Sequence, residues 1–443
     1  MRPLAFCRHL DEFGWAPRVL ATNAASIHPP LSVDPGLERR LPPTVRVLRV
    51  PHGDPLRAAI RFRDSVSRVS RAASISEPVG AEAPVEGSFA SWIGRRKSFV
   101  LEHLFAFPDH HVSWTRPAIR HALRACRRDP IDAVLATGKP WTSLVVGLKI
   151  ARALNVPFVA DFRDPWTRNP YGEWLPSVLS RAKRLERDIC TQASCVVTNT
   201  EELREQFAND YPELQDRFVT ISNGFDDWTS DTVGVGVGAP KPRGSCLELS
   251  HFGTVYGKRD PFALLTAIEQ LHQEGRIVPG MVRVRFVGRW LVTSPHSNEV
   301  TRALENLGFV VREPQVSHEE CLKQMREAHV LLALQPASPL QVPAKMYEYV
   351  AMGRPLLVIG GEGATAALVE RHGLGRCCSN RIDALKATLR ALIDDPTLTA
   401  PNPIARAQFH YRELTRTLAQ HLDEVVLTRS SRRAGALTLA RGD

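Results

Sequence analysis

Residues Ser338–Gly363 read SPLQVPAKMYEYVAMGRPLLVIGGEG, and they indicate a helix followed by a buried strand. Pro343 suits the first position of a helix, where its missing N–H costs nothing. The pattern of Lys345–Met352 is helical, and Pro355–Ile359 is a short apolar run typical of a strand buried on both faces. A helix that leads into such a strand is the repeating unit of an α/β fold with a mainly parallel sheet.

Units of the same kind extend in both directions from this stretch. In the second half we expect further strands at Leu247–Phe252, Val282–Val287 and Val330–Leu334, and helices at Pro261–Glu274, Glu319–Ala328 and Ala364–His372. In the first half we expect strands at Val45–Val50, Asp132–Ala136, Pro157–Asp161 and Cys195–Asn199, and helices at Thr142–Leu154 and Pro176–Thr191. The segment from Arg57 to about Ile93 is poor in apolar residues, and we interpret it as a helix followed by a mobile loop.

A Gly- and Pro-rich segment, TVGVGVGAPKPRGS (Thr232–Ser245), separates the two series and predicts a linker. The predicted division is an N-terminal domain 1–230, a linker 231–246, a C-terminal domain 247–403, a helix 404–428 and a basic disordered tail 429–443. Two doubly wound domains facing a central cleft would place the ligand beyond the carboxyl ends of their strands.

The composition excludes several classes of protein. The chain has 443 residues, of which 43% are apolar and 23% charged, so it is not wholly disordered, and two sizeable domains are expected. No apolar run approaches the ~20 residues needed to span a bilayer. Asp11 and Glu12 interrupt the place where a signal peptide needs its apolar core. The eight cysteines form no CxxC pair, which favours reduced thiols and a cytoplasmic location.

Basic residues exceed acidic ones by 57 − 47 = 10. From Arg57 to Arg128 there are 13 basic and 6 acidic side chains, a local net charge of +7. Such an excess favours an anionic partner, either nucleic acid, a lipid headgroup surface or a phosphorylated substrate. Charge alone does not choose among them, and an arginine-rich composition without a partner is the alternative.

Two segments of the second half are suited to bind a diphosphate. A helix that begins at Pro343 offers free amide donors and about half a positive charge, to which Lys345 adds a cation. Glu348 lies one turn further on the same face, where its carboxylate can accept two hydroxyl protons of a ribose. The second segment, HFGTVYGKRDP, places Gly253, Lys258 and Arg259 between a strand and a helix. Alternatively, these charged residues are a solvent-exposed Lys–Glu pair and surface loop cations.

Polar residues also follow a predicted buried strand of the first half, in the sequence DFRDPW. Asp161, Arg163 and Asp164 lie where side chains enter the cleft of a doubly wound sheet. Arg163 can bind a phosphate or polarise an acceptor, and Asp164 can orient an acceptor hydroxyl. The alternative is a structural Asp–Arg bridge that closes the loop.

These segments together resemble the GT-B glycosyltransferases, in particular the large retaining family numbered four. The resemblance implies two Rossmann-like domains around a cleft, a ribose contact by Glu348 and a diphosphate contact by Gly253 and Arg259. Members of the family usually carry another Glu eight residues before the position of Glu348, which contacts the transferred sugar. Here that position is Leu340.

DFRDPW, the segment Phe107–Leu123 and NGFD (Asn223–Asp226) also resemble a subgroup of family 4 that acts in surface polysaccharide synthesis. That subgroup usually opens with a strand and a glycine loop, which precede the helix that matches the start of this chain. We therefore expect the chain to begin inside that helix, without the usual first strand.

The resemblance implies a transferase that moves a sugar from a nucleoside diphosphate donor to a glycan or lipid-linked acceptor, with Arg163, Asp164, Arg259 and Lys345 as catalytic residues. No DxD motif is present, so neither a metal nor a cofactor is expected, and no nucleic-acid module is recognised. The basic N-terminal region would touch an anionic membrane. A non-catalytic GT-B scaffold and a nucleotide-sugar epimerase are the alternatives.

Overall fold

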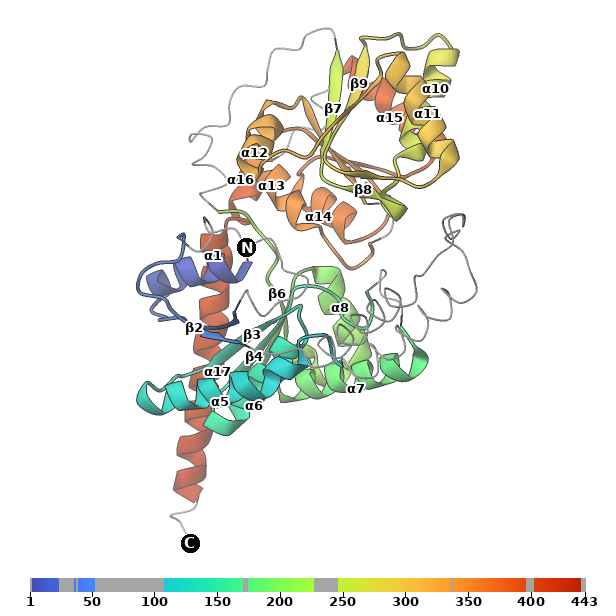
Figure 1. The fold of residues 1–443 in the computed structure, drawn as a ribbon. Helices are drawn as coiled ribbons and strands as arrows, with labels where there is room; N and C mark the ends of the chain where they lie inside the picture. Colours follow the sequence, from blue (N-terminus) through green and yellow to red (C-terminus); the bar gives the residue numbers. More distant parts are fainter. Residues whose placement is uncertain are drawn as a thin grey trace, which may run out of the picture. The chain divides into compact units, whose positions relative to one another are not determined.

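The computed structural model describes residues 2–23, 36, 39–51, 107–169, 174–226, 246–335, 338–395 and 402–439 (Figure 1). For Lys258, Pro403 and residues 432–439 it describes the backbone alone. The predicted linker, apart from Cys246, and the predicted mobile loop from Arg57 to Ile93 lie outside the described residues.

The chain divides into two compact units. The first comprises Met1–His9, Thr198–Asp210 and Thr220–Leu418, and the second comprises Leu10–Val197, Tyr211–Val219 and Ala419–Asp443. The contacts thus group two N-terminal helices, α1 (Arg2–His9) and α8 (Glu201–Asp210), with the C-terminal sheet. The domain boundaries predicted at residues 230 and 246 follow chain order, so they assign α1 and α8 to the N-terminal domain.

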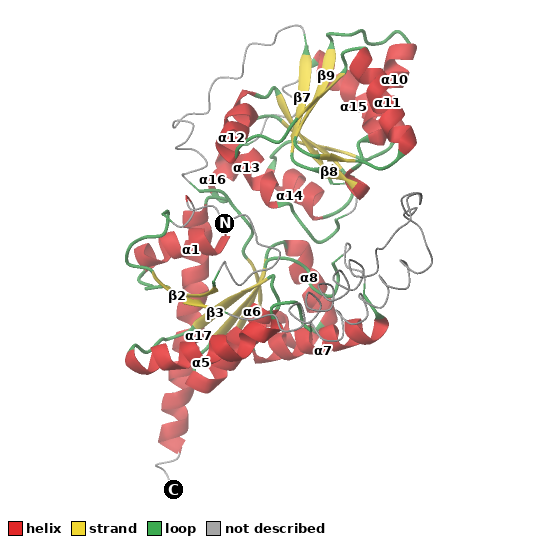
Figure 2. Ribbon diagram, viewed as in Figure 1, coloured by secondary structure: helices red, strands yellow, loops and turns green. Residues whose placement is uncertain are grey.

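The first unit is built on a six-stranded sheet in the order β11-β9-β7-β12-β13-β14 (Figure 2). Its strands are β7 (Leu247–Phe252), β9 (Val282–Val287), β11 (Val310–Glu313), β12 (Val330–Leu334), β13 (Leu356–Ile359) and β14 (Arg376–Cys378). All neighbouring strands pair in parallel. In chain order this is the doubly wound arrangement 3-2-1-4-5-6, so the strand order reverses between β7 and β12.

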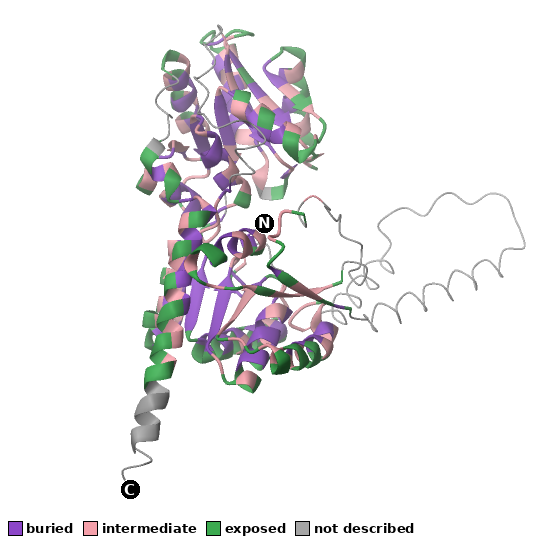
Figure 3. Ribbon diagram, turned by 90° about the vertical axis from the view of Figure 1, so that its left-hand side faces the viewer, coloured by how far each residue is buried: buried purple, intermediate pink, exposed green. Residues whose placement is uncertain are grey.

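The side chains of this sheet alternate between two cores. Its strands are largely coloured as buried in Figure 3. Val330 and Leu332 of β12 belong to one core, whereas Leu331 between them belongs to the other. The first core includes residues of α10 (Phe262–Gln273), α11 (Pro295–Asn306) and α15 (Ile382–Asp394). The second includes residues of α12 (His318–Glu327), α13 (Ala344–Met352) and α14 (Ala364–His372). A strand buried on both faces needs a continuous apolar run, which is the pattern that β12 and β13 show.

The second unit contains a sheet in the order β3-β4-β5-β6 and a parallel pair β1-β2. Its strands are β1 (Arg18–Thr22), β2 (Arg46–Val50), β3 (Val134–Gly138), β4 (Phe158–Phe162), β5 (Cys195–Thr198) and β6 (Phe218–Thr220). Helices α5 (Thr115–Arg128), α6 (Thr142–Leu154) and α7 (Pro176–Gln192) lie between these strands in the chain. The fold class is therefore the mixed α/β architecture with parallel sheets that the sequence predicts.

The C-terminal segment differs from the single helix predicted for residues 404–428. It forms α16 (Pro403–Ala407) and α17 (Tyr411–Leu439), because Phe225 pairs with the chain between them. The Phe225 N–H donates to Phe409 O over 3.0 Å, and the Tyr411 N–H donates to Phe225 O over 2.8 Å. Helix α17 also continues through residues 429–439, so the prediction that a disordered tail starts at 429 is wrong.

Candidate functional site

The carboxyl ends of β7 and β12 are the place where a doubly wound sheet binds its ligand. Gly253 follows β7 with φ +143°, a conformation that favours glycine, and its N–H donates to Val287 O over 2.9 Å. Gly288 follows β9, and a Cβ there would lie 2.3 Å from Gly253 O. The loop after β9 therefore packs so closely against Gly253 that position 288 accommodates no larger side chain without movement. A Cβ at Gly253 would meet only His251 Nε2, at 3.9 Å, so the backbone there stays open to a ligand.

His251 lies in β7 two residues before this glycine and is only 7% exposed. Its Nδ1 lies 2.9 Å from Leu332 O on β12. Because a carbonyl oxygen only accepts, Nδ1 carries the proton and the Nε2 of a neutral ring is an acceptor. Nε2 is buried and has no hydrogen-bond partner, and the position of a Cβ on Gly253 lies 3.9 Å from it.

Two predicted cations act on this imidazole. The pKa of His251 is lowered to about 4, mainly by burial and also by the positive charges of Arg259 and Lys345, whereas the hydrogen bond to Leu332 O raises it. Arg259 ends the short 3-10 helix η5 (Gly257–Arg259), and its guanidinium carbon lies 5.4 Å from the centre of the Tyr256 ring. Arg259 and Lys345, from two distant parts of the sequence, are thus brought to the end of β7.

Helix α13 supplies Lys345 and Glu348 from one face. Lys345 Nζ lies 3.8 Å from Glu348 Oε2 and 3.7 Å from the buried Cys321 Sγ. The helix is fixed to the glycine loop by Tyr349, whose hydroxyl accepts the Phe252 N–H over 2.8 Å. A movement of α13 would therefore also displace the end of β7.

Several buried polar atoms at this end of the sheet lack a hydrogen-bond partner. They are His251 Nε2, Arg259 Nε, Gln335 Oε1 and Glu348 Oε2. Gln335 follows β12 and is itself 6% exposed. A buried donor or acceptor without a partner costs about 1–3 kcal/mol, so several such atoms at one strand edge indicate a place that a ligand or ordered water completes.

Comparison with known proteins identifies the fold and a family match for part of the chain. Residues 83–228 match the model of Glycosyltransferase Family 4. The chain is 24% identical over 320 residues to glycogen synthase of Mycobacterium tuberculosis, which covers 66% of this chain and 70% of that protein. The Anabaena protein HepE in complex with UDP and glucose has a TM-score of 0.55 at 16% identity, covering 95% of both chains. A glycosyltransferase from Rickettsia africae has a TM-score of 0.57 at 12% identity, covering 96% of this chain and 93% of that one.

The chain has the fold of the GT-B glycosyltransferases, and its residues 83–228 match the family 4 model. The fold predicted from the sequence is thereby confirmed, and the predicted family is matched over that part of the chain. In the first unit, Gly253, Arg259, Lys345 and Glu348 all contribute to the end of β7 or to the first turns of α13. The backbone of Lys258 lies in η5, and its side chain is outside the described residues.

The other two predicted site residues, Arg163 and Asp164, follow β4 in the second unit. Arg163 Nη2 donates to Lys139 O over 2.6 Å. Since Lys139 follows β3, the neighbouring parallel strand, this bond joins two loops at the same edge of that sheet. The acceptor-side roles of Arg163 and Asp164 stay predictions.

Leu340, which stands at the position of the family's sugar-contacting Glu, is held through its backbone. The Thr200 hydroxyl donates to Leu340 O over 2.9 Å, and it also accepts the Leu203 N–H of α8 over 3.2 Å. The loop before α13 is therefore tied to the start of α8, within the first unit.

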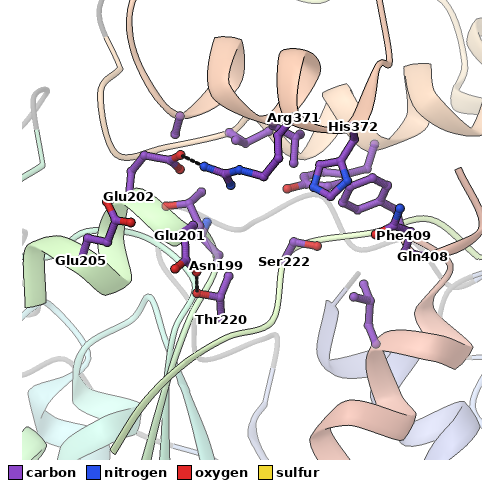
Figure 4. A pocket seen from close by; sticks show the side chains of 16 residues that line it. Asn199, Glu201, Glu202, Glu205, Thr220, Ser222, Arg371, His372, Gln408 and Phe409 are labelled. Atoms are coloured by element: carbon purple, nitrogen blue, oxygen red, sulfur yellow. Dashed lines mark hydrogen bonds and ion pairs between the residues drawn. The ribbon is translucent and has the colours of Figure 1, made fainter. Parts of the chain in front are cut away.

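The first unit also contains a cavity of about 550 Å³ that none of the predicted residues lines (Figure 4). Its polar lining comes from the start of α8, from residues 220–222 and from the end of α14. Two of its carboxylates are already paired with arginines: Glu202 with Arg371 at 3.1 Å, and Glu201 with Arg204 at 2.7 Å. Glu201 also accepts the Thr220 hydroxyl at 2.7 Å. Because these charges are compensated, the cavity offers hydroxyls and paired carboxylates that suit a polyhydroxylated ligand better than a free ion.

Two features of this site were not predicted from the sequence. His251 is a buried polar residue in the strand LELSHF, and a polar residue close to a strand's carboxyl end was the available signal. The same signal was present in Asn199, Thr200 and Glu201, which directly follow β5 and line the cavity.

Two further properties concern the described part of the chain as a whole. No group of three His, Cys, Asp or Glu side chains there is arranged to hold a metal ion. Among the same residues, no helix combines the length and the apolar character that a membrane span requires. All eight cysteines are free thiols, as their spacing predicts.

Proposed function

We propose that this protein transfers a sugar, with retention, from a nucleoside diphosphate donor to a glycan or lipid-linked acceptor. The observation that carries the proposal is the meeting of Arg259, Lys345 and the Gly253 turn around His251, at the strand-order reversal of a doubly wound sheet. The HepE structure, a relative in fold, contains UDP and glucose, which supports a nucleotide sugar as the ligand.

The diphosphate leaving group gains negative charge as its bond to the sugar breaks. Arg259, Lys345 and the amides at the start of α13 are the groups that stabilise this charge in the proposed reaction. They are held before the donor arrives, because Tyr349 fixes α13 to β7 and Gly288 fixes the loop after β7. The residues of the chain thus supply the compensating charge, and the proposed reaction uses no cofactor.

Glu348 is proposed to bind the ribose of the donor. Its Oε2 is buried without a hydrogen-bond partner, and its only charged neighbour among the described contacts is Lys345 at 3.8 Å. A carboxylate in this state can accept the two hydroxyl protons of a ribose diol, while Lys345 remains near the diphosphate.

The acceptor side is proposed to lie in the second unit. Arg163 would polarise or steer the acceptor and Asp164 would orient its hydroxyl, since both follow a parallel strand where such sheets bind ligands. The resemblance of DFRDPW to the surface-polysaccharide subgroup supports an acceptor of that pathway. The local net charge of +7 between Arg57 and Arg128 supports contact of the protein, from the cytoplasm, with the anionic inner face of a membrane.

Calorimetric titration with UDP and GDP tests the donor site. Glu348→Ala is expected to weaken nucleotide binding by about 1.5–3 kcal/mol, the range for hydrogen bonds to a charged group. Glu370→Ala is the matched control, because Glu370 is an exposed carboxylate on α14 of the same unit. Equal affinities for the wild type and a folded Glu348→Ala variant would refute the ribose contact.

A non-catalytic nucleotide-sugar binder is a second candidate, which Leu340 favours because an aliphatic side chain replaces the usual sugar contact. Release of UDP or GDP from sugar donors distinguishes the two. A chain that binds a nucleotide sugar and never releases nucleoside diphosphate, with or without a lipid-linked acceptor, is the binder.

A further inference from the structure

The donor site holds a buried acceptor that the proposed diphosphate contacts leave unused. His251 Nε2 has no hydrogen-bond partner, although Arg259 and Lys345 are close enough for their charges to act on the ring. Arg259 and Lys345 are donors, and they bind the oxygens of a diphosphate. A neutral His251 has the opposite requirement, since its Nε2 needs a donor.

Three features keep Nε2 an acceptor. The Leu332 carbonyl holds the proton on Nδ1, at 2.9 Å. The ring is buried against Phe286 of β9, with ring centres 6.1 Å apart, which disfavours a charged imidazolium. The charged side chains that act on it, Arg259 from η5 and Lys345 from α13, are both positive. Phosphate oxygens only accept hydrogen bonds, so they cannot donate one to Nε2.

We propose that His251 Nε2 accepts a hydrogen bond from a hydroxyl of the sugar on the donor, and this rests on the proposed function. Glu348, one helical turn along α13 from Lys345, provides the open acceptor for the ribose. His251 instead lies beside Gly253, at the diphosphate end of the site, where the transferred sugar is attached. Leu340 has no polar atom in its side chain, so His251 supplies a sugar contact that the usual Glu does not provide here.

Two substitutions distinguish the hydrogen bond made by Nδ1 from the one proposed for Nε2. His251→Asn keeps an amide donor within reach of Leu332 O but ends short of the position of Nε2. His251→Gln reaches that position with an amide oxygen, so it is the conservative variant. Thermal unfolding of each full-length variant shows whether it folds.

Calorimetry with two probe pairs, UDP with UDP-glucose and GDP with GDP-mannose, provides the test, using the pair that the wild type binds. His251→Asn is expected to lower the affinity for the nucleotide sugar about tenfold and to leave that for the parent diphosphate unchanged. His251→Gln is expected to recover part of the loss.

Two results would overturn the inference. If His251→Asn leaves both affinities unchanged, Nε2 is completed by water alone. If it lowers both affinities equally, the residue contacts the nucleotide and not the sugar. A wild-type chain that binds none of the four probes would instead contradict the proposed function itself, and the inference with it.

Discussion

His251 shows how a single buried polar residue is understood only through its neighbours. In the sequence it is a single polar residue near the end of an apolar strand. It is tolerated there because its ring is hydrogen-bonded to the carbonyl of Leu332, which lies 81 residues away in the chain. By contrast, Gly253, Arg259, Lys345 and Glu348 are predicted from local patterns, because helix termini and glycine loops bind phosphates through local geometry, and their ligand contacts stay predictions. Contacts across the sheet depend on strand order, which no local pattern specifies.

The buried imidazole makes stability depend on pH. Burial lowers its pKa from 6.5 to about 4, so between these values the unfolded chain binds a proton that the folded chain does not. Stability from this group is therefore complete above pH 6.5 and lost as the pH falls toward 4. The full difference corresponds to about 3 kcal/mol, of which about 2 kcal/mol is lost between pH 7.5 and 5.

Urea unfolding of the wild type and of His251→Asn at both pH values measures this contribution, because other titrating groups cancel in the difference. The wild type's advantage over the variant is expected to shrink by about 2 kcal/mol at pH 5. A constant difference between the two proteins would show that the folded imidazole titrates normally.

Among the elements, the buried strands and the short helices between them were predicted best. Strands β7, β9 and β12 and helix α14 have the bounds that the sequence indicates. A glycine follows β7 and β9, and glycines flank α14 on both sides, so local pattern and tertiary burial agree there. The C-terminal helix was predicted without its break, since the break depends on the pairing of Phe225 with the chain at His410.

The packing of the loops after β7 and β9 predicts an unusually severe glycine substitution. Gly288→Ala introduces a Cβ 2.3 Å from Gly253 O at a residue with φ +144°. The loop at Gly253 has to move, so we expect about 2–4 kcal/mol of destabilisation and a loss of nucleotide binding in calorimetry.

Gly308→Ala provides the control for this prediction. Its φ is +81°, and nothing lies within 4 Å of the added Cβ, so it carries the backbone strain without the clash. It is expected to cost about 1–2 kcal/mol and to bind nucleotide normally. Equal effects of the two substitutions on nucleotide binding would show that the contact between the loops does not shape the site.

At the scale of the whole molecule, the sequence predicts two doubly wound halves and an uneven charge. Part of that charge is ordered on α5, where Arg116, Arg120, Arg124 and Arg128 recur every four residues and are exposed. Residues at this spacing lie along one face of a helix. Membrane contact of the region from Arg57 to Arg128 is proposed from net charge, and the arginine face of α5 is the candidate surface for it.

Vesicle co-sedimentation tests this surface. If α5 rests on anionic lipid at about 1 kcal/mol per arginine, replacing Arg120 and Arg124 by Gln lowers binding to phosphatidylglycerol vesicles roughly thirtyfold.

Replacing Arg276 and Arg390 by Gln removes the same charge from exposed positions of the first unit, and this control is expected to bind more tightly than the α5 variant. Binding to neutral phosphatidylcholine vesicles should be weak for all three proteins, and salt should weaken the wild type's binding because the attraction is screened. Equal binding of both variants would mean that net charge, and not the α5 face, brings the protein to the membrane.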